Sequence, residues 1–377
     1  MFTESTTEPR PARLGRRLLG SSLARALATP HGVDRYVELV KPTFSLRDVR
    51  AEVVSVQRRT PTSATVTLRP NDNWRGFRAG QHVLLSTEIG GVRRTRPYSP
   101  ANSEHDGGLV ELTVHARPGG AVSPHLRTRL LAGDVVGLSQ AQGDFALPRR
   151  RPRELLLISG GSGITPLMAM LRTLCDEGHD GPIAFLHYAR AERHIAYAEA
   201  LARLAARHPN VRLLRSLTRV GGLGGGELDG HFSADHVELA GIDPEEAEAF
   251  VCGPAALVDA VHGQWARTGL EQRLHVERFA PPPLAPLPAD ADAASGALRF
   301  ARSGVEAANR GGTLLDQAEA AGLRPQSGCR MGICHTCSCR KLAGAVRDVR
   351  SGEISTAPDE QIQICVSVPL GDVTLDI

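Results

Sequence analysis

Cysteines with a metal-binding spacing stand near the end of the chain. Cys329, Cys334 and Cys337 form a C-x4-C-x2-C group, and Cys365 follows after a further 27 residues. This spacing is typical of a two-iron, two-sulfur centre, in which four thiolates converge on the two irons. Zinc more often uses paired C-x2-C hooks, so a zinc site or a set of buried free thiols is the less favoured interpretation. We therefore expect a 2Fe–2S cluster with these four ligands.

The residues around the cysteines fit such a centre. Gly328 and Gly332 let the loop turn inward, so that backbone N–H groups can face the cluster sulfurs. Residues 313–322 predict a helix whose apolar side packs beneath the loop, and Cys339 is assigned to packing. Residues 297–377 as a whole resemble a plant-type ferredoxin, whose signature includes CRxGxC. The resemblance implies a β-grasp fold.

A second group of residues could bind a flavin. The tetrapeptide 96–99 (RPYS) combines a cation for phosphate, an aromatic ring for stacking and a hydroxyl for the flavin N5. Taken alone, it is also compatible with an ordinary turn. Residues 119–123 (GGAVS) precede a helix-like segment, where backbone N–H groups could cradle a pyrophosphate. Together the two segments indicate a flavin dinucleotide site.

These two motifs resemble those of the ferredoxin reductase family, in which RxYS and GxxS bind flavin. The second motif favours FAD over FMN, because only the dinucleotide has a pyrophosphate. The resemblance implies that Tyr98, Ser99 and Cys252 lie at the reacting rings. The expected FAD contacts are Arg96, Pro97, Tyr98, Ser99, Val114, His115, Gly120, Val122 and Ser123.

A nicotinamide-binding loop is expected where an apolar strand, residues 154–160, runs into glycines. Residues 159–166 (SGGSGITP) end this strand and open a helix, which is the context that pyrophosphate binding requires. This loop and residues 251–254 (VCGP) match elements of the same reductase family, in which the cysteine lies near the nicotinamide ring. A buried strand thiol is the alternative for Cys252. The expected contacts are Gly160, Gly161, Ser162, Gly163, Thr165, Cys252, Gly253 and Pro254.

The choice between NADPH and NADH depends on the charges that follow two later strands. Arginines bind a 2′-phosphate, whereas an acidic residue binds a free ribose hydroxyl. Arg190 and Arg193 flank Glu192. Ser216 and Arg219 follow the next strand. By resemblance these positions contact the 2′-phosphate, which favours NADPH and leaves NADH as the alternative.

The rest of the chain must position these groups. Short β-branched segments and turns predict an antiparallel barrel or sandwich, and the resemblance to the reductase family implies a Greek-key flavin-binding barrel. Alternating strands and helices predict a doubly wound parallel sheet, with one helix over 243–250. The fold class is therefore a multidomain combination of β, α/β and α+β parts. The expected divisions are a basic extension (1–47), an FAD-binding β-barrel (48–150), an NADP-binding α/β domain (151–280), a Pro/Ala linker (281–296) and a 2Fe–2S ferredoxin domain (297–377).

Composition and charge narrow the class of partner. The 377 residues carry a net charge of only +3, which argues against a nucleic-acid partner. No apolar run reaches spanning length and no secretory signal is evident, so we expect a cytoplasmic protein. Leucines and arginines in residues 13–28 predict a basic amphipathic helix. This helix either contacts the inner face of the cell membrane or packs on its own protein.

Together these features predict a flavin-dependent NAD(P)H oxidoreductase. The resemblance implies hydride transfer from NADPH to FAD, followed by single-electron steps through the cluster to a redox partner. Residues 31–44 and 74–83 resemble actinobacterial reductases that serve membrane fatty-acid desaturases. A desaturase is therefore the expected acceptor, and a soluble Rieske or haem monooxygenase is the alternative. A non-catalytic redox sensor is disfavoured, because it has no use for two dinucleotide sites.

Overall fold

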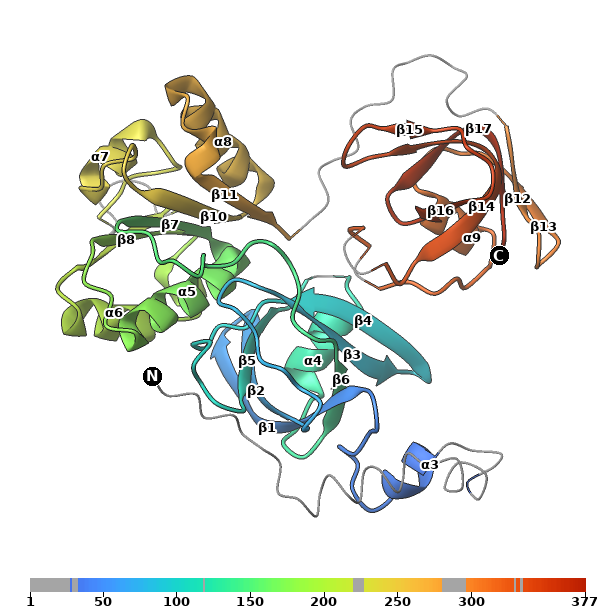
Figure 1. The fold of residues 1–377 in the computed structure, drawn as a ribbon, viewed down its shortest axis with the longest axis horizontal. Coiled ribbons are helices and arrows are strands. Elements are labelled where there is room, and N and C mark those ends of the chain that lie inside the picture. Colours follow the sequence, from blue (N-terminus) through green and yellow to red (C-terminus); the bar gives the residue numbers. More distant parts are fainter. Residues whose placement is uncertain are drawn as a thin grey trace.

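The computed structural model describes residue 28 and residues 33–117, 119–219, 227–279, 296–328, 330–332 and 335–377. Figure 1 shows three lobes, with the first below and the other two above it on either side. The expected three-part architecture is confirmed. Almost all of the predicted amphipathic helix and of the Pro/Ala linker lie outside the described residues, as do Cys329 and Cys334.

The first lobe is an antiparallel sheet curved into a barrel. The strand order is β4-β3-β6-β1-β2-β5, so β6 returns over a long connection to lie between β1 and β3. Pro100, directly after β4, forms a bridge with Leu112 of β5 and brings the two ends of the sheet together. Inward-facing apolar side chains and Leu126 of the short helix α4 fill the interior. The elements are α3 (Val33–Val37), β1 (Val49–Thr60), β2 (Ser63–Pro70), β3 (Val83–Ile89), β4 (Val92–Tyr98), β5 (Val110–His115), α4 (Val122–Thr128) and β6 (Val135–Leu138).

The second lobe is a parallel five-stranded sheet of order β11-β10-β7-β8-β9. All residues of β7 and β8 are buried, as expected of central strands covered on both faces. Figure 1 shows α5 and α6 on one side of this sheet and α7 and α8 on the other. The elements are β7 (Leu155–Gly160), α5 (Ile164–Asp176), β8 (Ile183–Ala189), α6 (Ala198–Arg207), β9 (Val211–Leu217), α7 (Ala234–Ala240), β10 (Glu248–Gly253), α8 (Ala255–Thr268) and β11 (Leu274–Arg278), with 3-10 turns η1 (Gly161–Gly163), η2 (Glu192–His194) and η3 (Glu271–Arg273).

The prediction of a helix over residues 243–250 is wrong. The Asp243 side chain accepts the backbone N–H of Glu245 at 2.9 Å, and this turn is not continued as a helix. From Glu248 onward the chain forms β10, which pairs with β7 on one side and β11 on the other. Tertiary pairing in the middle of a sheet therefore overrides the helical preference of the Glu- and Ala-rich sequence. The neighbouring helix is α7, which ends at Gly241 in the left-handed conformation.

The third lobe is a mixed sheet with one helix. Strand β12 pairs antiparallel with β13 and parallel with β17, while β14 lies on the other side of β17. Helix α9 lies within the expected segment 313–322, and Leu314, Leu315 and Ala318 bury its apolar side. The elements are β12 (Ala297–Phe300), β13 (Val305–Ala308), α9 (Leu314–Ala320), β14 (Ser338–Asp348), β15 (Ile354–Ser355), β16 (Glu360–Gln363) and β17 (Ser367–Leu375).

Polar contacts hold the barrel against the α/β domain. Arg151, in the connection between them, donates to Glu104 of the barrel and to Glu177 at the end of α5, each at 2.6 Å. The buried hydroxyl of Tyr197 bonds to Thr113 of β5. These contacts join groups far apart in sequence, so they fix how the two lobes face each other.

The segment before β1 exposes apolar side chains. Leu39 and Val40 are 79% and 89% exposed, and Tyr36 of α3 is 48% exposed. The residues that follow are tied to the barrel, because the Asn71 amide donates to the carbonyl of Thr43 at 2.9 Å. Among the helices within the described ranges, none is long and apolar enough to cross a membrane.

Candidate functional site

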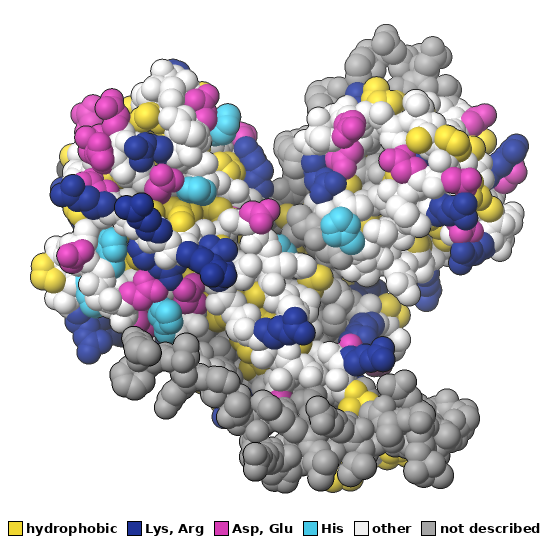
Figure 2. All heavy atoms as spheres, viewed as in Figure 1, with side chains coloured by type: hydrophobic (Ala, Val, Ile, Leu, Met, Phe, Trp, Pro, Cys, Tyr) yellow, Lys and Arg dark blue, Asp and Glu magenta, His cyan; other side chains and the backbone are white. Residues whose placement is uncertain are grey.

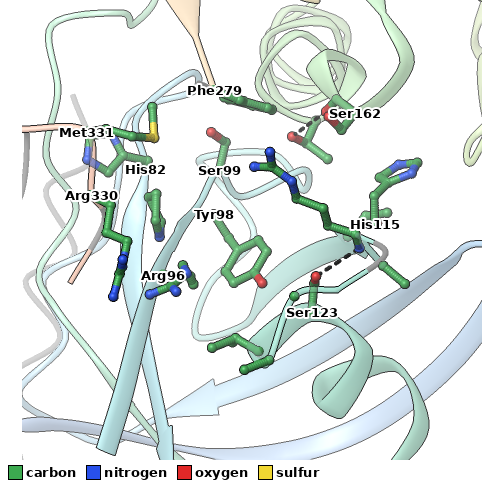
Figure 3. A pocket seen from close by; sticks show the side chains of 18 of the residues that line it. His82, Arg96, Tyr98, Ser99, His115, Ser123, Ser162, Phe279, Arg330 and Met331 are labelled. Atoms are coloured by element: carbon green, nitrogen blue, oxygen red, sulfur yellow. Dashed lines mark hydrogen bonds between the residues drawn. The ribbon is translucent and has the colours of Figure 1, made fainter. Parts of the chain in front are cut away.

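A cavity of about 850 Å³ lies where the three lobes meet. Figure 2 shows the surface hollowed between the α/β domain and the C-terminal lobe, and Figure 3 shows the side chains that line the cavity. The α/β domain contributes Ser162, Thr165, Glu277 and Phe279, and the C-terminal lobe contributes Arg330 and Met331. The barrel contributes His82, Arg96, Pro97, Tyr98, Ser99, Thr113, His115, Ala116, Arg117, Gly119, Gly120, Ala121, Val122 and Ser123.

The residues of the RPYS motif stand at the end of β4, where the strand reaches the cavity. Tyr98 pairs in register with Val83, and Ser99 is only 3% exposed. Burial raises the pKa of Tyr98, so its hydroxyl stays neutral across the working pH range. Figure 3 shows the Tyr98 ring between Arg96 and Ser123. The cavity therefore presents an aromatic face, a buried hydroxyl and a cation side by side, the groups that a flavin requires.

The loop 119–123 forms another side of the cavity. Gly119 has a φ of +73°, and the Gly120 N–H donates to the carbonyl of Arg117 at 3.0 Å. Ser123 Oγ accepts the Arg117 N–H at 3.0 Å, so this hydroxyl fixes the loop itself. Among the described residues no side chain caps the start of α4 at Val122. The arrangement is compatible with an anionic group beside these backbone donors.

The glycines of the second loop are required by contact with β10. Gly161 has a φ of +53°, which makes the tight turn. A Cβ on Gly163 would lie 2.1 Å from the carbonyl oxygen of Cys252, and one on Gly253 would lie 3.0 Å from the backbone nitrogen of Gly160. The loop therefore packs directly on the end of β10. This close packing delivers Ser162 to the cavity wall at the start of α5.

Cys252 and Glu277 are adjacent on β10 and β11. They are register partners, and Cys252 is fully buried whereas Glu277 lines the cavity. Burial raises the pKa of the Cys252 thiol, and the nearby Glu277 charge raises it further. Burial also raises the pKa of Glu277 to about 7. The cavity thus contains a carboxyl group that changes charge near neutral pH.

The described cysteines of the expected cluster lie in one apolar core. Cys337 and Cys365 are both buried and belong to the cluster of apolar side chains that includes Leu314 and Leu315 of α9. The Ile364 N–H donates to the Cys337 carbonyl at 3.3 Å, which brings the two ligand segments together. Buried thiols on adjoining segments suit a thiolate-bound cluster, which needs a dry, rigid site.

Comparison with known proteins agrees with this geometry. Family models match an oxidoreductase FAD-binding domain at residues 52–147, an oxidoreductase NAD-binding domain at 157–263 and a 2Fe-2S iron-sulfur cluster binding domain at 299–370. The NADPH oxidoreductase of Mycobacterium tuberculosis is 35% identical over 360 residues, covering 94% of this chain and 91% of that protein. The chain belongs to the ferredoxin reductase-type flavoproteins with a C-terminal ferredoxin domain.

Other members of this flavoprotein family are similar to this chain over most of its length. The glycine betaine monooxygenase reductase subunit of Pseudomonas aeruginosa is 32% identical over 318 residues, covering 80% of this chain and 87% of that protein. The solved structure of phthalate dioxygenase reductase has the same fold, with a TM-score of 0.58 and 22% identity over 87% of this chain and 97% of that one. The chain is accordingly a flavin-dependent NAD(P)H oxidoreductase whose cofactors are FAD and a 2Fe–2S cluster.

The cavity brings together about half of the contacts expected from the sequence of this flavoprotein. The expected residues in its lining are Arg96, Pro97, Tyr98, Ser99, His115, Gly120, Val122, Ser123, Ser162 and Thr165. The expected residues outside its lining are Val114, Gly160, Gly161, Gly163, Arg190, Arg193, Ser216, Arg219, Cys252, Gly253 and Pro254. Val114 is a core residue of the barrel, whereas the glycines shape the loop beneath Ser162.

The residues expected at the 2′-phosphate lie at the ends of β8 and β9. The Arg219 N–H donates to the Arg190 carbonyl at 3.3 Å, and both side chains are exposed, as is that of Arg193. Ser216 is buried, and its hydroxyl donates to the carbonyl of Gly230. The arginines therefore form an exposed group, whereas the serine hydroxyl is engaged inside the domain.

Sequence reasoning missed several residues of the lining. Glu277 and Phe279 stand at and just beyond the end of β11, a strand that the sequence patterns did not predict. An alternating LHVERF segment directly before the Pro-rich stretch was the signal that could have found them. Arg330 and Met331 come from the ferredoxin domain. Their presence at a flavin site depends on how the domains meet, for which the sequence carries no local signal.

Proposed function

We propose that this chain passes electrons from NADPH through FAD and the 2Fe–2S cluster to an oxygen-activating enzyme, and that this enzyme is a membrane fatty-acid desaturase. The observation that carries the proposal is the convergence of three segments on one cavity: the flavin motif, the nicotinamide loop and the cluster loop. FAD, when bound, would take a hydride from the nicotinamide and release electrons singly, which suits a one-electron cluster.

The barrel residues would bind and orient the flavin. Arg96 and the loop 119–123 would hold the phosphates, the Tyr98 ring would stack on the isoalloxazine, and Ser99 would donate to its N5. Because Ser99 is buried, its hydroxyl would meet the flavin rather than bulk water. These residues supply position and charge rather than a general base.

The α/β domain would present the nicotinamide. Ser162 and Thr165 line the cavity from the loop side, and Phe279 closes it from the end of β11. Glu277, when ionised, would stabilise the positive charge that develops on the nicotinamide ring as its hydride leaves. Cys252 is fully buried beside Glu277 and would support this wall of the cavity from behind.

The charges after β8 and β9 support NADPH as the electron donor. Arg190, Arg193 and Arg219 are exposed, and an exposed cation is available to a 2′-phosphate. The acid among them, Glu192, pairs with Arg215 at 3.2 Å. The residue that would favour a free ribose hydroxyl is therefore already engaged.

The N-terminal segment supports a membrane-bound acceptor. The exposed Leu39 and Val40 precede Lys41, and residues 13–28 carry leucines and arginines at helical spacing. The NADPH oxidoreductase of M. tuberculosis aligns over so much of this chain that the shared part must reach into residues 1–47. Residues 31–44 and 74–83 resemble reductases that serve membrane desaturases. We therefore propose that this segment brings the protein to the inner face of the cell membrane.

A soluble oxygenase is the second candidate acceptor. The similarity to the glycine betaine monooxygenase reductase subunit favours it, because that alignment covers 80% of this chain and 87% of that protein. The test is NADPH-driven turnover with each kind of acceptor in turn, a membrane desaturase and a Rieske oxygenase component, with product formation as the measurement. Desaturation that depends on this chain supports the proposal, and turnover with the soluble oxygenase alone contradicts it.

A further inference from the structure

The loop that precedes and carries the cluster cysteines is held through two backbone carbonyls. Within the ferredoxin domain, Arg350 Nη1 donates to the carbonyl of Gly332 at 2.6 Å, and the same guanidinium pairs with Asp348. At the start of the loop, the carbonyl of Gly328 accepts a hydrogen bond of 2.8 Å from Nη1 of Arg96. Arg96 belongs to the barrel. Gly328 is therefore held by the flavin-binding domain, and Gly332, four residues later, is held by its own domain.

Arg96 is also the cation of the flavin motif. It lies on β4 in register with Leu85, and it lines the cavity. Nη1 donates to the carbonyl of Thr95 at 2.7 Å as well, which orients the guanidinium plane. A guanidinium has five N–H donors in one plane, and the hydrogen bonds to Thr95 and Gly328 are both made by Nη1. The same side chain can therefore hold a phosphate and the cluster loop together.

We propose that Arg96 links FAD binding to the docking of the ferredoxin domain. This inference rests on the proposed FAD site and extends it to a contact between domains. A phosphate beside Arg96 fixes the side chain, so that less conformational entropy is lost when Gly328 meets it. By thermodynamic linkage, docking of the ferredoxin domain must strengthen FAD binding by the same factor by which bound FAD strengthens docking.

The ferredoxin domain closes part of the flavin cavity when it docks. Arg330 and Met331 stand in the cavity wall directly after the Gly328 contact. Arg330 is itself held to α9 by ion pairs with Asp316 and Glu319. The loop is thus stiffly attached to its own domain, and a constraint at Gly328 acts on the domain as a whole. Coupling between two sites is typically 5- to 150-fold, and we expect about tenfold here.

The test measures docking by hydrogen exchange in the full, cluster-loaded chain. Exchange of the peptide spanning residues 324–332 is compared with and without saturating FAD, and FAD affinity is measured separately by flavin fluorescence. Arg96→Lys keeps a positive charge for the phosphate. It removes the planar guanidinium, whose separate N–H groups can bond a phosphate and a carbonyl at the same time. Arg93→Met, an exposed position on the same strand and outside the cavity lining, is the matched control.

In the wild-type protein and in Arg93→Met, FAD should slow exchange of this peptide about tenfold. Arg96→Lys should still bind FAD at saturation but show no FAD-dependent protection. Unchanged exchange in wild type despite bound FAD overturns the linkage, as does protection retained in Arg96→Lys. A wild-type chain that binds no FAD would instead overturn the proposed flavin site, and the linkage with it.

Discussion

Cys252 and Glu277 lie side by side on β10 and β11, and the burial that keeps the thiol neutral also brings the pKa of the carboxyl to about 7. The ordinary value for Glu277 is 4.5, so its carboxylate is disfavoured in the folded protein. Between pH 4.5 and 7 folding must retain a proton that the unfolded chain releases. The folded state therefore loses stability as the pH rises through this window.

Glu277→Gln should remove that dependence. At pH 8 the variant should have a higher free energy of unfolding than wild type, by at most about 3 kcal/mol, and therefore a higher melting temperature. This difference should vanish near pH 4.5. Thermal unfolding at both pH values measures it. Glu245→Gln, exposed in the same domain, is the control. An equal change at pH 8 and pH 4.5 would show that the carboxyl does not titrate as described.

The contact of Arg151 with Glu177 makes stability depend on pH in the opposite direction, at low pH. Its hydrogen bond lowers the pKa of Glu177 from 4.5 to about 2, so this contact stabilises the protein above pH 4.5 and is lost as the pH falls towards 2. Arg151→Met should cost about 1–2 kcal/mol at pH 7 and progressively less towards pH 2. Denaturant titrations measure the cost. Arg203→Met, from the exposed pair with Glu199, should cost less than about 0.5 kcal/mol.

Gly163→Ala tests the contact between the nicotinamide loop and β10. The new methyl group would overlap the Cys252 carbonyl at 2.1 Å, so the loop must move. We expect a loss of about 2–3 kcal/mol in stability and at least a tenfold loss in kcat/KM for NADPH with ferricyanide as acceptor. Gly107→Ala, where a Cβ meets nothing within 4 Å, should leave both unchanged. Wild-type kinetics in Gly163→Ala would contradict the assigned role of the loop.

Cys337 and Cys339 offer a matched pair on the ferredoxin domain. Cys337 is a buried expected ligand, whereas Cys339 is a half-buried thiol that donates to the carbonyl of Arg340 at 3.5 Å. Cys337→Ser should lose the cluster's visible absorption and the bound iron, and with them the reduction of cytochrome c. Transfer from NADPH to ferricyanide should continue. Cys339→Ser should keep iron, colour and both activities; loss of iron in both variants would question the ligand set.

Arg190→Ala tests the preference for NADPH. If this exposed arginine meets the 2′-phosphate, KM for NADPH should rise about tenfold, while KM for NADH stays the same. Steady-state kinetics with ferricyanide separate the two donors. Arg207→Ala, at the end of α6, should change neither constant. Equal effects of Arg190→Ala on the two donors would argue against a phosphate contact.

The sequence predicted the parts of this site that lie within a few residues of one another. Tyr98 ends one strand and Ser99 follows it, and Ser162 follows another strand, so short motifs in the right context indicate their places. The cysteine spacing is likewise a feature of neighbouring residues. These features are local, and local geometry is what spacing encodes.

The parts that sequence reasoning missed depend on long-range contacts. Residues 243–250 have helical composition, but 243–247 form a turn and 248–250 begin β10, because β7 and β11 pair with this segment on either side. Glu277 acquires its unusual pKa from burial next to that strand. Arg330 and Met331 reach the flavin cavity only because two domains meet. None of these facts follows from the identities of adjacent residues.

The unequal contacts between domains have a consequence for building hybrid reductases. Arg151 and Tyr197 tie the barrel and the α/β domain together through side chains on both partners, so exchanging either one alone would break matched pairs. The ferredoxin domain meets Arg96 through the backbone carbonyl of Gly328, which any sequence provides. A ferredoxin domain taken from a relative should therefore keep this hydrogen bond to Arg96 whatever residue stands at position 328, whereas its residues at positions 330 and 331 must still suit the cavity wall.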